Sequence, residues 1–263
     1  MRELFAHLNA RRRGWQEARA GRAAAPPQVP AGAAAQTVML GETPVLLACT
    51  DAGRAGPLFV SLHENEQTSV QAAHALLPAS GGRLLELKAR GRRLVAFRIE
   101  GRWQVFDPNR IFTPAGLRGT LARHGSPDLA AADAVGRLRD AVLAQLQRAA
   151  PAAVVALHNN RGGRYSVLQY LAGGDHARDA AAVWAPRPAK PEDFFVLTQR
   201  GHCEALAARG FNCVLQADAP ADDGSLSVWS QGRTQPYVNL ETREGRVDEA
   251  RAMLAAVCEV LAG

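Results

Sequence analysis

Two apolar segments of this chain each end in a histidine, and this feature limits the possible folds more than any other. Residues 57–62 (PLFVSL) run directly into His63, and residues 153–157 (AVVAL) run directly into His158. Short apolar runs of this kind are typical of buried strands in an α/β sheet. Ligands of open α/β sheets bind at the carboxyl ends of the strands, so we expect both imidazoles at that edge.

A glutamate that follows the first histidine completes a candidate set of metal ligands. If the chain turns into a helix after His63, the side chain of Glu66 can reach the same cation as the imidazole. Together with His158 it makes a His/Glu/His set, which leaves a fourth position for water as in catalytic zinc sites. Glu64 competes with Glu66, but it directly follows His63 and is expected to point away. The sequence therefore predicts one zinc ion at these three residues.

Strand and helix patterns alternate along the rest of the chain, which predicts an α/β fold with a mixed, mostly parallel sheet flanked by helices. Residues 100–101 (EG) are expected to turn a hairpin, and residues 222–225 (DDGS) a tight turn, with lining of a site as the alternative role. The expected strands are 45–49, 58–62, 84–87, 94–99, 103–106, 153–157, 194–197, 211–215, 226–229 and 237–240, and the expected helices are 66–77, 128–149, 200–209 and 247–261.

Composition limits the domain organisation and the partners. The 263 residues, 47% of them hydrophobic, suffice for one large domain over residues 37–263, preceded by a basic, Ala/Pro-rich arm over residues 1–36 with a helix at 2–21. The net charge is +6, but the basic residues are scattered, so no nucleic-acid partner is expected. Neither a membrane span nor a signal peptide is evident, which predicts a cytoplasmic protein unless a leader was removed.

Three motifs, taken in order, resemble a known superfamily. They are residues 63–66 (HENE), 107–112 (DPNRIF) and 157–159 (LHN). This series resembles the zinc carboxypeptidases, and more closely their aspartoacylase and succinylglutamate desuccinylase relatives. The resemblance covers residues 57–160, and residues 236–241 (PYVNLE) are similar to the strand that ends in the catalytic glutamate of that superfamily.

The resemblance implies a zinc carboxypeptidase-like fold and a hydrolytic mechanism. Residues 37–263 would be the catalytic domain, and Glu241 would be the general base that takes a proton from the zinc-bound water. Zinc lowers the pKa of its water to about 7, so a nearby carboxylate can form hydroxide at neutral pH. Glu244 remains the alternative base.

The resemblance also implies the residues that bind substrate. Asn109 and Arg110 would hold a substrate carboxylate, because a guanidinium group binds a carboxylate with two parallel hydrogen bonds. Deacylases often carry a further arginine shortly before this pair, and Arg102 has about that offset. Carboxypeptidases use a tyrosine, a role that Tyr237 would take. The sequence departs from the deacylases at residues 63–66 (HENE), since those relatives usually carry a glycine between the two ligands.

Two functions follow from this reading. The preferred one is zinc-dependent hydrolysis of an amide bond next to a carboxylate, in a peptide or an N-acyl amino acid. The alternative is a catalytically inactive binding module that keeps the carboxypeptidase-like fold.

Overall fold

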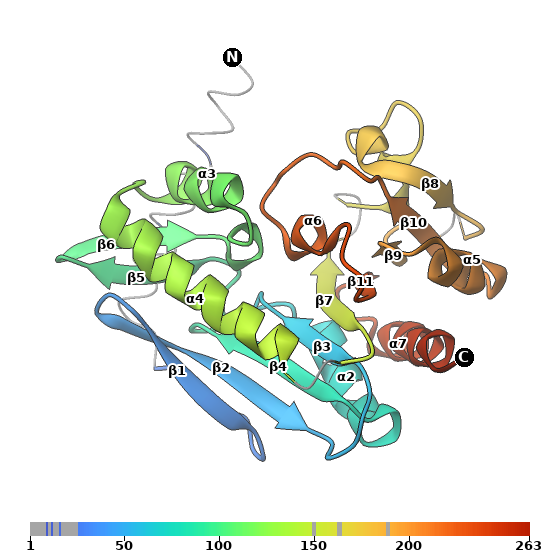
Figure 1. The fold of residues 1–263 in the computed structure, drawn as a ribbon, viewed down its shortest axis with the longest axis horizontal. Helices are drawn as coiled ribbons and strands as arrows, with labels where there is room; N and C mark the ends of the chain where they lie inside the picture. Colours follow the sequence, from blue (N-terminus) through green and yellow to red (C-terminus); the bar gives the residue numbers. More distant parts are fainter. Residues whose placement is uncertain are drawn as a thin grey trace.

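A computed structural model of the chain describes residues 26–148, 151–161, 165–187 and 190–263, with the single positions 9, 12 and 16. Nine strands form one large sheet, and two more form a separate hairpin (Figure 1). The helix expected over residues 2–21 lies outside the continuous ranges. The strands of the large sheet, in spatial order, are β1 (Ala34–Leu40), β2 (Thr43–Asp51), β4 (Arg83–Lys88), β3 (Leu58–Ser61), β7 (Val154–Asn160), β11 (Tyr237–Arg243), β9 (Phe194–Leu197), β10 (Asn212–Gln216) and β8 (Ala180–Trp184).

The expected mixed sheet is confirmed, and its parallel pairs lie mainly in its centre. Strands β4, β3, β7 and β11 pair in parallel, as do β9 and β10. The other four pairs described within this sheet are antiparallel and include both edges. The edge strands β1 and β8 were not expected from the sequence, and β1 begins three residues before the expected start of the domain.

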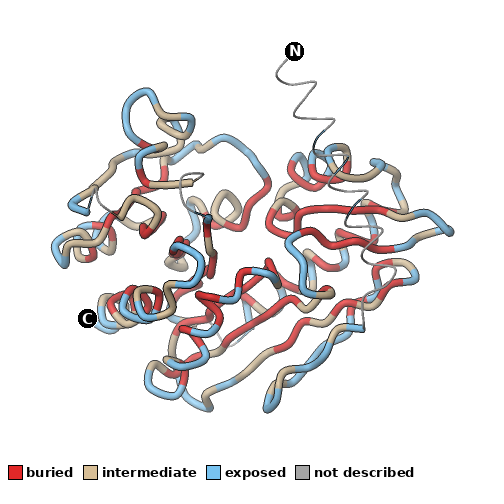
Figure 2. The backbone as a smooth tube through the Cα atoms, turned by 180° about the vertical axis from the view of Figure 1, so that it is seen from behind, coloured by how far each residue is buried: buried red, intermediate tan, exposed pale blue. Residues whose placement is uncertain are grey.

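Helices cover both faces of this sheet, as the alternation of side chains along β7 demonstrates. Val154 and Ala156 belong to the apolar core that includes α4, whereas Val155 and Leu157 belong to the core that includes α2, α5 and α7. Buried residues accordingly follow the strands and the inner sides of the helices (Figure 2). The helices are α2 (Gln67–Ser80), α3 (Pro114–His124), α4 (Leu129–Gln147), α5 (Arg200–Ala208), α6 (Leu226–Ser230) and α7 (Val247–Ala262). No helix in the described part of the chain has the length and apolar character needed to cross a bilayer.

Two segments differ from the sequence prediction in their secondary structure. Residues 226–229 were expected as a strand but form the short helix α6, because the Ser225 hydroxyl caps it by accepting from the Val228 amide. Helix α3 was missed, although Thr113 caps it and Pro114 occupies its first turn. Hairpin β5 (Val95–Ile99) and β6 (Arg102–Phe106) is as expected, with its turn at residues 100–101.

Three short 3-10 segments complete the described structure. They are η1 (Pro108–Arg110), η2 (Val167–Tyr170) and η3 (Ala177–Asp179). Segment η1 belongs to the DPNR motif, and Asp107 caps it by accepting from the Asn109 amide.

Candidate active site

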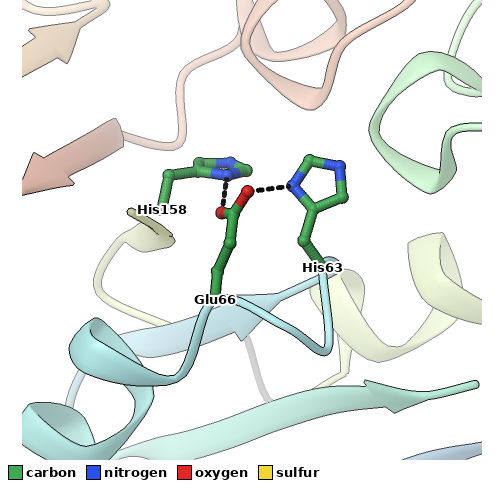
Figure 3. A group of neighbouring side chains, drawn as sticks. All are labelled: His63, Glu66 and His158. Carbon is green, nitrogen blue, oxygen red and sulfur yellow. Dashed lines mark hydrogen bonds and ion pairs between the residues drawn. The ribbon is translucent and has the colours of Figure 1, made fainter. Parts of the chain in front are cut away.

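The three residues expected to bind metal meet at neighbouring strand ends. After β3 the chain makes one turn, in which the Glu66 amide donates to the His63 carbonyl over 2.9 Å, so Glu66 stands at the start of α2. His158 comes from β7, which pairs directly with β3. The Glu66 side chain therefore rises between the two imidazoles (Figure 3).

The carboxylate of Glu66 contacts both histidines through different oxygens. Its Oε1 lies 3.1 Å from His63 Nδ1, and its Oε2 lies 2.9 Å from His158 Nδ1. All three side chains are buried, and one candidate ligand atom from each lies within 4.8 Å of the others. Two imidazoles and a carboxylate are donors that zinc accepts.

One buried atom supports a cation at this position. His63 Nε2 lies 2.8 Å from Asp107 Oδ1, and since a carboxylate only accepts, Nε2 is the nitrogen that carries the proton when the ring is neutral. The lone pair on Nδ1 then faces Glu66 Oε1, and Nδ1 has no hydrogen-bond partner. Two facing acceptors need positive charge between them, which a proton or a metal ion provides. The site thus fits a divalent cation, with Asp107 orienting one ligand as metal-bound histidines usually require.

Neighbouring charges shift the pKa values of Glu66, His63 and Asp107 in the direction that favours the charged form of each group. Burial opposes ionisation of Glu66, but His63 and His158 outweigh it and hold the pKa of Glu66 well below its usual range. Burial also opposes the charged form of His63, yet Glu66 and Asp107 raise its pKa. Burial would raise the pKa of Asp107, but His63 and Arg93 lower it strongly. These shifts all favour ionised carboxylates facing positive charge.

An arginine that was not expected stands beside the ligands. The guanidinium group of Arg93 donates to Glu66 Oε1 and lies 3.7 Å from Asp107 Oδ2. Its side chain is 46% exposed and faces the pocket. Arg102, the expected substrate arginine, is instead on the hairpin, where it pairs with Glu100 at 3.2 Å and Asp128 at 3.5 Å. The sequence contains no signal that separates Arg93 from its arginine neighbours.

The expected base, Glu241, lies next to the ligands on the same face of the sheet. It is the register partner of His158 in the parallel pair of β11 and β7. Its oxygens accept from the amides of Asn160 at 3.3 Å and Asn239 at 3.4 Å. Burial raises its pKa, which suits a group that takes and returns a proton. Glu244, the alternative base, is more than half exposed and pairs with Arg161 at 2.9 Å.

The Asn-Arg pair divides its contacts between the protein and the pocket. The Asn109 oxygen accepts from the Leu226 amide at 3.1 Å, and its nitrogen lies 3.4 Å from His158 Nε2, so both amide atoms have partners within the chain. Arg110 donates to the Asn109 carbonyl at 2.7 Å and lies 3.4 Å from Asp223 Oδ2. Its side chain is 35% exposed and available to a ligand.

A pocket of ≈ 790 Å³ is lined by Glu66, His158 and Glu241, and also by Arg93 and Arg110. Tyr237 also lines it, and burial raises the pKa of its hydroxyl strongly. Tyr165 and Tyr170, joined through their hydroxyl groups, form a further part of the wall. The volume suits a small molecule or a short peptide end.

No protein-family model and no curated protein matches the chain. Its solved structural neighbours include the murein-tripeptide amidase MpaA of Escherichia coli O157, at 16% identity and TM-score 0.44 over 92% of this chain and 95% of that one. Another is a succinylglutamate desuccinylase/aspartoacylase of Rhodobacter sphaeroides, at 12% identity and TM-score 0.44, which covers 88% of this chain and 65% of that one. A third is an aspartoacylase family protein of Mesorhizobium loti, at 12% identity and TM-score 0.41, which covers 90% of this chain and 71% of that one.

The names of the second and third neighbours are those of the aspartoacylase and succinylglutamate desuccinylase group that the motifs resemble. The identities of all three neighbours are low and their TM-scores lie below 0.5, so they indicate nothing about the activity of this chain.

Proposed function

We propose that this protein is a zinc-dependent hydrolase that cleaves an amide bond next to a substrate carboxylate, in a peptide or an N-acyl amino acid. One observation carries the proposal. His63 Nδ1 lies 3.1 Å from Glu66 Oε1 in a buried cluster with His158, and a second buried carboxylate, Glu241, stands beside it at the wall of an open pocket.

Zinc held by His63, Glu66 and His158 would polarise a carbonyl oxygen and lower the pKa of a water molecule. The protein supplies the proton transfer. Glu241 is buried with two amide donors, and its raised pKa allows it to accept a proton from water and deliver it to the leaving nitrogen. Asn160 and Asn239 fix the direction in which its oxygens point.

The two pocket arginines serve different parts of the reaction. Arg93 is next to the ligand Glu66, so its N–H groups can stabilise negative charge that develops on the scissile carbonyl oxygen. Arg110 is the last residue of the DPNR motif, and its side chain is partly exposed, which suits it to bind the substrate carboxylate. Two guanidinium groups in one pocket favour an anionic substrate.

The test is a hydrolysis assay on zinc-reconstituted protein with N-acetyl amino acids, short peptides and their matched C-terminal amides. We expect turnover of the free carboxylates and at least tenfold slower turnover of the amides, because Arg110 then loses a charge-assisted bond. Equal rates for both would refute the carboxylate requirement. Zinc binding with no turnover of any substrate would favour the alternative, a binding module.

A further inference from the structure

The residue between the first two candidate ligands, Glu64, is joined to a neighbouring loop. Its Oε2 accepts from the backbone amides of Ala89 and Gly91, both at 2.6 Å. These amides belong to the β4–β5 connection, which also carries Arg93. One carboxylate oxygen therefore ties the segment that holds His63 and Glu66 to the segment that holds Arg93.

The loop needs such an anchor because of its backbone conformation. Arg90 has φ 74° and Gly91 has φ 72°, so two successive residues are left-handed. A non-glycine residue pays a steric cost in this region, which persists only where the surroundings impose it. Glu64 accepts from the amide on each side of Arg90 and so holds the turn in this shape.

The shape of the turn decides where Arg93 points. Two residues after Gly91 the chain presents the guanidinium group to Glu66 Oε1 and to Asp107 Oδ2. The Arg93 position thus depends on an anchor that comes from within the metal-ligand segment itself.

We propose that Glu64 is a positioning residue for Arg93, and that through Arg93 it tunes the affinity of the His63, Glu66 and His158 site for its metal. The reason is that the guanidinium group competes with a cation for Glu66 and repels it. The catalytic meaning of this link rests on the proposed function. The link itself does not, since metal affinity is measured without substrate.

The experiment is a zinc competition titration against a chelating dye, on the wild type, Arg93→Ala, Glu64→Ala and the double variant. Arg93→Ala is expected to bind zinc roughly tenfold tighter, because one charge-assisted bond to Glu66 is lost and Arg93 is half exposed. Glu64→Ala is expected to shift affinity in the same direction by roughly threefold, and to add nothing in the Arg93→Ala background.

A matched control separates this role from general bracing. Glu42 accepts from the Gly101 amide at 3.0 Å in another left-handed turn, at Glu100 and Gly101, whose residues do not line the pocket. Glu42→Ala should leave zinc affinity unchanged. Glu64→Gln keeps an acceptor oxygen and should behave as wild type, whereas Glu64→Asp keeps the charge but loses the reach and should behave as Glu64→Ala.

The hydrogen-exchange rates of the Ala89 and Gly91 amides are a second measurement, and both amides should exchange faster in Glu64→Ala. If the zinc shift of Glu64→Ala is equally large with and without Arg93, the two residues act independently and the proposal is wrong. Faster exchange with unchanged zinc affinity would also overturn it, and would leave Glu64 as a structural brace. Neither result depends on whether any substrate is hydrolysed.

Discussion

The inner and outer halves of the pocket are built in different ways. The inner half consists of Glu66, His158 and Glu241, which line the pocket, and of the fully buried His63 that contacts Glu66. These residues come from the neighbouring strand ends of β3, β7 and β11. The outer half contains groups such as the partly exposed pair of Arg110 and Asp223, which are brought together by connections more than 100 residues apart in the chain. Sheet geometry fixes the first half, and loop packing fixes the second.

This difference predicts different responses to mutation. In the inner half the polar side chains are buried and contact one another, so the loss of one leaves another without its partner and poorly solvated. In the outer half solvent can replace a lost partner, and exposed ion pairs contribute about 0–1 kcal/mol. We therefore expect substitutions in the inner half to abolish most of the activity, and substitutions in the outer half to change it only partly.

The largest effect is expected for Glu241→Gln. This variant keeps the shape of the side chain but cannot accept a proton, so hydrolysis should fall on the order of 10²–10⁴-fold while zinc content is retained. Steady-state kinetics and elemental analysis check both parts. Glu244→Gln is the matched control and should change the rate little, since Glu244 is exposed and paired with Arg161. A dead Glu244→Gln beside an active Glu241→Gln would show that the base is the other carboxylate.

A smaller effect is expected for Arg110→Lys. Lysine keeps the charge but loses the fork that binds a carboxylate at two points. For substrates with a free carboxylate, kcat/KM should fall about ten- to a hundredfold, and for the matched amides it should hardly change. Arg102→Lys on the hairpin is the control and should be neutral for both. A loss of thermal stability without any change in substrate preference would mean that Arg110 serves only the fold.

The smallest effect is expected for Asp223→Asn. Asp223 lies 3.4 Å from Arg110, and the two side chains are 47% and 35% exposed. Removal of this competing carboxylate should lower KM for carboxylate substrates by no more than about fivefold, in keeping with an exposed pair. In the Arg110→Lys background the gain should shrink. An increase in KM would show that Asp223 helps to orient Arg110 and does not compete with the substrate.

The same contrast explains what the sequence could predict. Spacing alone brings Glu66 to His63, because one turn after a strand has fixed dimensions, and the apolar runs fix the strand ends of His63 and His158. Arg93 could not be found this way, since its position depends on a left-handed turn that Glu64 holds from another segment. Arg102 has the offset of a deacylase arginine in sequence, but the structure places it on the hairpin beside Glu100 and Asp128.

Secondary structure follows a similar rule. The central strands and α4 were predicted well because apolar periodicity is strong there. Helix α6 was expected as a strand because five residues are too few for a period to be recognised, and the decisive contact is the cap from Ser225. The N-terminal arm over residues 1–36 stays a prediction, apart from the start of β1 at Ala34.

The measurement that tests the central claim most directly is the zinc content of purified, zinc-reconstituted protein by elemental analysis. Wild type should hold about one zinc per chain, while His63→Ala and His158→Ala should each lose most of it, because two protein ligands hold zinc poorly. His202→Ala, on α5, is the control and should keep the full amount. Equal zinc in His63→Ala, His158→Ala and wild type would contradict the site, as would a wild type that binds none.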